Sequence, residues 1–128
     1  MANIRNMEAQ LKSIRPFIGA KNFEISSAFY RDLGFQVTVL EPKLSVFVAK
    51  GLSFYLQDYY AKDWVDNTMV FMEVEDVDQF YQYLLTLSLP AKYKDVSVST
   101  VQIMDWGRVC YVHDPSGILW HFGQFSIR

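Results

Sequence analysis

The stretch DPSGILWHFGQ, residues 114–124, decides both the fold and the question of function. It opens with turn-forming residues: Asp114 can accept bonds from nearby amides, Pro115 fixes φ, and Gly117 tolerates a strained backbone. The apolar run that follows is typical of a buried strand and contains one imidazole, His121. A second imidazole, His113, immediately precedes the turn. The two histidines are therefore candidate metal ligands, a candidate catalytic pair, or ordinary strand residues.

Outward from this stretch, the chain divides into two halves with the same order of elements. Asn22 is a good N-cap for a helix that ends at Gly34, where a C-terminal glycine cap belongs, and Asp76 caps a second helix. A strand precedes each helix, over 13–20 and 68–75. Three strand-like segments follow each helix, over 35–40, 44–50 and 52–59 in the first half and over 98–105, 108–114 and 117–125 in the second.

Both helices carry apolar stripes at helical spacing, which predict their buried faces. Gln79, three residues after the second cap, predicts a capping box. Residues 59–67 are polar and aromatic and are predicted to be a connector, and residues 89–98 have no clear pattern. The predicted buried stripes are Ile25, Ala28, Phe29 and Leu33 in the first helix and Val77, Phe80, Leu84 and Leu85 in the second.

Matched positions in the two halves indicate an internal repeat. Phe17 and Phe71 each lie five residues before a helix cap. In the last strand of each half, one residue lies four positions after a glycine. This residue is Tyr55 in the first half and His121 in the second. The order β-α-β-β-β therefore occurs twice and predicts an α+β fold of two modules, over about 12–58 and 68–125.

The composition limits the possible functions. The chain has 128 residues, is 51% hydrophobic and 16% aromatic, and has a net charge of −2. It can build a packed core, and it has no general attraction to nucleic acid. No apolar run approaches the ~20 residues of a membrane span, and the first residues lack the apolar segment of a signal peptide. With one cysteine, we expect a cytoplasmic location.

The runs ISSAFYRDLGF, VFMEVEDVDQFYQYL and DPSGILWHFGQ, in that order, resemble the vicinal oxygen chelate superfamily, the glyoxalase and bleomycin-resistance proteins. The resemblance covers residues 14–125 and is strongest to the bleomycin-resistance members. It implies that two βαβββ modules form a curled mixed sheet around a ligand cup. It also implies a homodimer.

The same resemblance implies four positions for metal ligands. They are occupied here by Arg15, Tyr55, Met69 and His121. A guanidinium has no lone pair to offer, a thioether is a poor ligand for hard divalent ions, and a phenol is a rare one. One imidazole remains, so we expect neither a metal nor another cofactor.

Other polar groups are weaker candidates. Glu73 shares a strand face with Met69 but lies about 13 Å along the strand. A His121–Glu73 pair is a candidate acid/base site, although a solvated strand end is the simpler interpretation. His113 is expected to be a structural or surface residue, and Cys110 a buried, unreactive thiol.

Aromatic residues and charge indicate what the cup could hold. Trp64 and Trp106 fall in polar connectors and are predicted near its mouth, either stacking on a planar ligand or contacting a dimer partner. Seven carboxylates between residues 58 and 78 face one Lys62, which favours a cationic ligand. Arg15 favours an anionic or zwitterionic ligand instead.

We therefore expect a metal-free small-molecule-binding homodimer, possible ligands being cationic aromatic drugs of the bleomycin type. The predicted ligand-binding residues are Arg15, Phe17, Tyr55, Trp64, Met69, Phe71, Trp106 and His121. Two alternatives stay open. One is a lyase, isomerase or dioxygenase that uses a metal or His121, and the other is an interaction module whose aromatic loops bind a protein.

Overall fold

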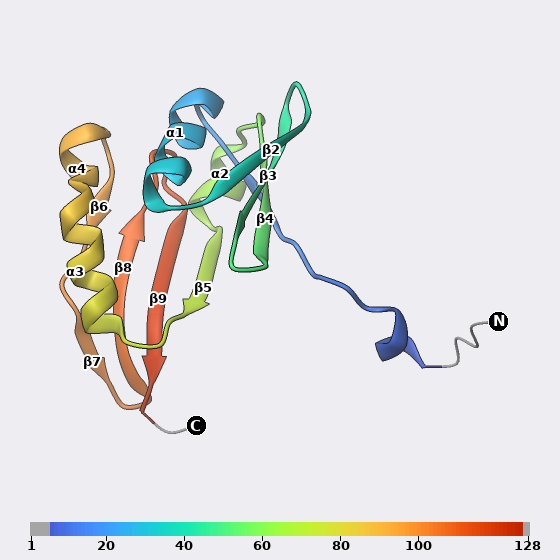
Figure 1. Ribbon diagram of the computed structural model, residues 1–128. Helices are drawn as coiled ribbons and strands as arrows, with labels where there is room; N and C mark the ends of the chain where they lie inside the picture. The colour runs from blue at the N-terminus through green and yellow to red at the C-terminus, as the bar shows by residue number, and fades with distance from the viewer. Residues whose placement is uncertain (1–5, 127–128) are drawn as a thin grey trace.

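The computed structural model describes residues 6–126, which form two mixed β-sheets flanked by helices (Figure 1). The first sheet has the strand order β1-β4-β3-β2, in which β1 runs parallel to β4 and the other pairs are antiparallel. Its strands are β1 (Phe17–Gly19), β2 (Gln36–Glu41), β3 (Leu44–Ala49) and β4 (Leu52–Gln57).

The second sheet repeats this plan. Its order is β5-β9-β8-β6, β5 is parallel to β9, and a further strand, β7, also pairs with β8. The strands are β5 (Met69–Glu73), β6 (Ser97–Val98), β7 (Gln102–Met104), β8 (Gly107–His113) and β9 (Leu119–Phe125). The predicted fold class, α+β with two βαβββ modules and open mixed sheets, is confirmed.

The helices begin and end near the predicted caps. The Asn22 side chain accepts a hydrogen bond from the Ile25 amide, and Asp76 accepts one from the Gln79 amide. Gly34 closes the first helix with a φ of 128°. The helical segments are the 3-10 turn Met7–Gln10, α1 (Phe23–Leu33), α2 (Lys62–Asp66), α3 (Val77–Leu87) and α4 (Leu89–Lys92).

Four details of the sequence prediction are wrong. The first strand is shorter than 13–20, and the connector over 59–67 contains α2. The segment 98–105 is not one strand, since only residues 102–104 of it form β7 after the short β6. Ile25 and Leu85, predicted to be buried, are 45% and 50% exposed.

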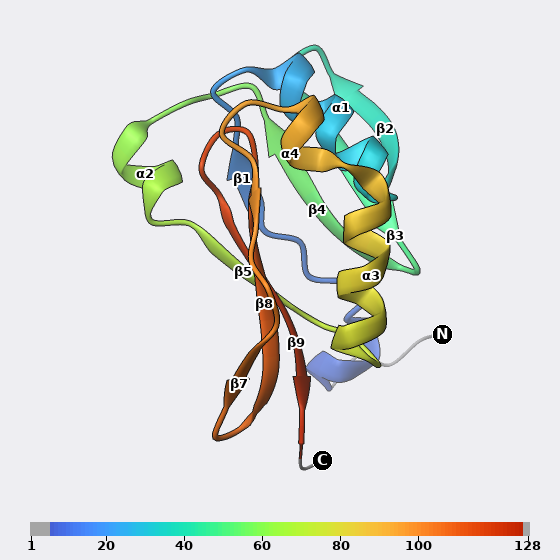
Figure 2. The same ribbon diagram turned by 90° about the vertical axis from the view of Figure 1, so that its left-hand side faces the viewer.

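One core joins the two modules. Figure 2 shows α1, α3 and α4 on the same side of the second sheet, and the sheet faces beneath them contribute the core. Phe29 is buried as predicted, whereas Phe80 is only partly buried, and Phe35 and Trp120 add two further buried rings. Within residues 6–126 no helix is long and apolar enough to cross a membrane.

A buried polar network ties α1 to the turn of the DPSG motif. The Tyr30 hydroxyl donates to Asp114 Oδ2 at 2.6 Å and accepts from Trp120 Nε1 at 2.8 Å. The other oxygen of Asp114 accepts three amides, those of Ser116, Gly117 and Ile118, at 2.8–2.9 Å. The motif is thus turn chemistry, as predicted, and it also links the two modules.

Candidate functional site

Each sheet has one face turned away from the core. Along β5 the exposed residues alternate with half-buried ones, so Met69, Phe71 and Glu73 share the outward face. On β9, Trp120 and Phe122 are buried in the core, and His121 between them points the other way. We call the outward face of each sheet its cup face.

An aromatic platform covers the cup face of the second sheet. The Phe71 ring lies 5.8 Å from Trp106, 6.1 Å from His121 and 5.7 Å from Phe125, between ring centroids. The Tyr111 ring meets His121 edge-on at 5.0 Å. Phe71 is 44% exposed and Trp106 39% exposed, so part of this platform is open to a planar ligand. We keep the name platform for Phe71, Trp106, Tyr111, His121 and Phe125.

Gly123 makes the platform possible. A Cβ at this position would lie 2.5 Å from Phe71 Cζ and 3.3 Å from Trp106 Cη2. Both rings can therefore lie over the strand backbone only because the residue beneath them has no side chain. In the register of the sheet, Glu73 stands opposite Gly123, so its carboxylate lies beside the platform.

His121 is half-buried among these rings. Burial lowers the pKa of its imidazole below the ordinary value of 6.5. The side chain is therefore neutral at pH 7. A neutral imidazole can stack on a ligand, accept or donate a hydrogen bond, or act as a base.

The cup face of the first sheet carries a smaller, positively charged group. The Tyr55 ring lies 4.7 Å from the Phe17 ring, and Arg15 Cζ lies 5.7 Å from the centre of the Tyr55 ring. Arg15 Nη1 also donates to the Tyr55 hydroxyl at 3.3 Å. The structure thus brings three of the predicted residues together through direct contacts.

The two groups occupy equivalent places in the repeat. Phe17 pairs with Tyr55 in the parallel register of β1 and β4, and Phe71 pairs with His121 in that of β5 and β9. The alignment inferred from the glycines therefore agrees with the register of the strands. The ring contacts and the hydrogen bond described above join residues of the same sheet, so the two groups are separate clusters.

The remaining predicted residues have different surroundings. Met69 is 65% exposed at the start of β5. Trp64, on α2, covers Gly19, where a Cβ would lie 2.5 Å from Trp64 Cζ3, and its ring lies 6.0 Å from that of Tyr59. Each sheet thus has a glycine beneath a tryptophan.

The two histidines share the cup face of the second sheet, but their environments differ. His113 is exposed, and its Nδ1 lies 3.1 Å from the Ser97 hydroxyl on the neighbouring strand. Cys110 points to the core, where burial raises the pKa of its thiol to about 11. The surface histidine and the buried thiol agree with the sequence predictions.

The four positions of the metal motif hold a poor donor set. Arg15 and Tyr55 bond to each other, and Met69 contributes only a thioether. In the part of the chain that is described, no three His, Cys, Asp or Glu side chains gather in a way that could hold a metal ion. These residues do not fit a divalent cation.

Several of the acidic residues have local partners. Asp66 pairs with Lys62 along α2, and Asp78 pairs with Arg108 at 2.8 Å. Asp76 is occupied as the cap of α3. The seven carboxylates therefore produce a weaker field than their number suggests. Glu73 lies on the cup face of the second sheet.

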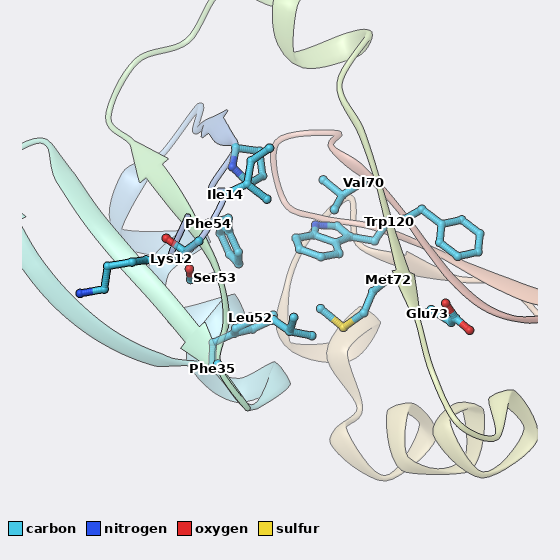
Figure 3. Close-up of a pocket in the computed structure, with 14 residues that line it drawn as sticks. Lys12, Ile14, Phe35, Leu52, Ser53, Phe54, Val70, Met72, Glu73 and Trp120 are labelled. Atoms are coloured by element: carbon cyan, nitrogen blue, oxygen red, sulfur yellow. The ribbon is translucent and has the colours of Figure 1, made fainter. Parts of the chain in front are cut away.

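A hollow that the sequence did not reveal lies between the two sheets (Figure 3). It has a volume of about 570 Å³ and adjoins a second hollow of about 650 Å³. The core rings Phe35, Phe54 and Trp120 border it, together with Leu52 and Met72. None of the five hollows described along residues 6–126 is lined by Arg15, Tyr55, Met69 or His121.

Sequence analysis missed two members of the platform. Phe125 lies two residues after Gly123 and four after His121, so strand alternation alone places it on the same face. Tyr111 is the cross-strand partner of His121, which requires the register of β8 and β9. The position of Phe125 could therefore be predicted from the sequence, whereas that of Tyr111 could not.

Comparison with known proteins finds similarity in structure but not in sequence. No family model matches the chain, and no curated protein matches its sequence. A bleomycin-binding protein complexed with bleomycin superposes with a TM-score of 0.73 at 16% identity, covering 89% of this chain and 98% of that one. The bleomycin-binding protein from Streptomyces verticillus, complexed with copper(II)-bleomycin, has a TM-score of 0.73 at 20% identity over 88% and 95% of the two chains.

An enzyme also shares the architecture. Lactoylglutathione lyase from Agrobacterium tumefaciens matches with a TM-score of 0.68 at 19% identity, over 90% of this chain and 95% of that one. Binding proteins and a lyase thus share the arrangement of both modules. The chain has the fold of the bleomycin-resistance and glyoxalase proteins, the vicinal oxygen chelate fold that its motifs predict.

Proposed function

We propose that the protein is a metal-free receptor that binds a large planar aromatic molecule without altering it. The observation that carries this proposal is the partly exposed platform over Gly123. Phe71, Trp106 and Phe125 are rigid rings that lose little conformational entropy when a flat ligand stacks on them. The donor set at the motif positions favours recognition over metal chemistry.

A cationic drug of the bleomycin type is the ligand class that we propose first. Glu73 stands beside the platform, and the π-faces of Phe71 and Trp106 attract a positive charge. Bleomycin is the ligand of two structural neighbours. The weakened acidic field means that stacking, more than long-range attraction, would supply the affinity.

We also propose that the working unit is a homodimer. The cup faces leave Phe17, Met69 and Phe71 between 44% and 65% exposed, which is unusual for apolar side chains gathered on sheet surfaces. If the first sheet of one protomer faces the second sheet of its partner, the Arg15 group and the platform form the two walls of one cup. The trapped ligand would then be buried on both sides.

A specific observation favours one alternative function. His121 is neutral and lies on the cup face, where it could act as a base on a bound substrate. An acid/base lyase or isomerase would need a second group to return the proton, and Tyr111 and Glu73 are candidates on that face. This alternative predicts turnover, whereas a receptor predicts none.

Isothermal titration of the purified protein with metal-free bleomycin tests the proposal. We expect one molecule bound per cup, no change after dialysis against EDTA, and recovery of intact drug after incubation. Elemental analysis should find no stoichiometric metal, and light scattering should give the mass of a dimer. Absence of heat at high micromolar drug contradicts the drug class, and chemically altered ligand favours the enzyme.

A further inference from the structure

We propose that Arg15 and Tyr55 form an anion subsite in the cup, so that the preferred ligand carries a carboxylate beside its planar aromatic part. This inference rests on the proposed function and narrows its ligand class. The platform explains how a flat molecule is held, but it does not explain why a guanidinium occupies the opposite cup face.

Most of the N–H donors of Arg15 make no hydrogen bond within the described residues. A guanidinium carries five N–H groups in a planar fork, and one of them, at Nη1, donates to the Tyr55 hydroxyl at 3.3 Å. Within residues 6–126 the ion pairs are those of Lys62, Lys92 and Arg108, and Arg15 is not among them. Its charge has no carboxylate partner in the described part of the chain.

The Tyr55 hydroxyl provides a second hydrogen-bond donor beside the Arg15 guanidinium. Because its oxygen accepts the bond from Arg15, its own hydroxyl proton is left to point elsewhere. An oxyanion seated beside this pair would accept N–H from the guanidinium and O–H from the phenol. Both bonds would be charge-assisted, the stronger kind of hydrogen bond, and a carboxylate matches the planar fork.

Stacked rings hold this pair in place. The Arg15 guanidinium lies over the Tyr55 ring, and that ring contacts Phe17 at a centroid distance of 4.7 Å. Tyr55 is anchored in the sheet, where its amide donates to the Pro16 carbonyl at 2.9 Å. The side chain of Arg15 is therefore oriented by its neighbours, which reduces the entropy lost when it binds an anion.

The two cup faces then differ in their chemistry. The first sheet offers Arg15 and a phenol, and the second offers Glu73 beside aromatic rings. An aromatic molecule with a carboxylate would satisfy both walls, with its carboxylate on Arg15 and its flat part on the platform. A purely cationic ligand would leave the guanidinium without a counter-charge inside the closed cup.

Two dyes that differ by one group test this inference. Rhodamine B carries a cationic three-ring system and a free carboxylate, and in its ethyl ester the carboxylate is blocked. We expect the protein to bind rhodamine B about tenfold more tightly than the ester, the ratio that one charge-assisted bond supplies. Fluorescence anisotropy measures both affinities under the same conditions.

Single substitutions show which residues cause the preference for rhodamine B over its ester. Arg15→Gln should reduce the ratio to within about twofold, because rhodamine B loses its partner and the cationic ester is no longer repelled, and Tyr55→Phe should reduce it partly. Arg31→Gln, on the exposed side of α1, is the matched control and should keep the ratio. If the wild-type protein binds both dyes equally, or the ratio survives Arg15→Gln, the anion subsite is wrong while the receptor function stands. If neither dye binds, the proposed function itself fails.

Discussion

The Tyr30 hydroxyl donates a 2.6 Å hydrogen bond to Asp114 and so joins the first helix to the turn that opens the last strand. Both residues are completely buried. Asp114 also holds the turn together through three amides. The cup faces belong to different modules, so this contact sets how the two faces of one chain are oriented relative to each other.

Removal of the Tyr30 hydroxyl should destabilise the protein measurably. In Tyr30→Phe, the buried Asp114 loses one partner and the Trp120 indole N–H loses its acceptor. We expect the free energy of unfolding to fall by about 2 kcal/mol, the usual cost of an unsatisfied buried group. Urea denaturation measures this free energy. Tyr60→Phe, which changes an exposed ring, is the control. An unchanged midpoint would show that the network is dispensable.

A methyl group on Gly123 should disable the platform without unfolding the chain. The added Cβ would meet Phe71 Cζ at 2.5 Å, and Phe71, being 44% exposed, can swing away. For Gly123→Ala we expect stability to change by about 1 kcal/mol or less and affinity for the rhodamine ester to fall about tenfold. Leu85→Ala, on the exposed side of α3, should keep that affinity. Undiminished binding to Gly123→Ala would place the ligand elsewhere, and the hollow between the sheets would be the next candidate.

The His121 imidazole should titrate below the ordinary value of 6.5, because burial lowers its pKa. As pH falls, His121 is protonated in the unfolded chain before it is protonated in the folded chain. The free energy of unfolding therefore decreases as pH falls below about 6.5. Proton NMR of the His113→Gln variant, which retains one histidine, measures the pKa directly. A midpoint above 6.5 would indicate that a nearby anion, rather than burial, governs the ring.

Stability should decline in alkaline solution. Burial raises the pKa of Cys110 to about 11, and burial together with Asp114 raises the pKa of Tyr30 well above its usual value. Between the ordinary thiol value of 9.0 and about 11, the unfolded chain releases a proton that the folded chain retains, so the free energy of unfolding falls as pH rises. Urea midpoints at pH 8 to 11 measure the slope. Cys110→Ala should be less stable throughout but should show a shallower slope, and an equal slope would exclude the thiol as the cause.

The sequence predicted most of the fold because its signals are local. Caps at Asn22 and Asp76, the glycine at position 34 and the DPSG turn each specify a boundary through short-range bonds. The first strand was overestimated because Pro16 has no N–H to give to β4, so regular pairing begins at Phe17. Hydrophobicity alone predicts that Ile25 is buried, whereas Ser26 takes the buried place on α1 through a contact with Ser116 in the other module.

The site was less predictable than the fold. The family resemblance pointed to Arg15, Tyr55, Met69 and His121, but it could not show that the Arg15 head group turns onto Tyr55. The platform depends on ring packing over Gly123 and on the register between β8 and β9, and both are long-range properties. The hollow between the sheets depends on how the modules are set against each other, which no local pattern encodes.

The shared register of Phe17 with Tyr55 and of Phe71 with His121 has a consequence for how the molecule could change. The same position of the repeat carries different side chains in the two halves, so the proposed anion subsite and the platform lie in separate halves of the chain. A lineage could retune one property by altering a single half and leave the other untouched.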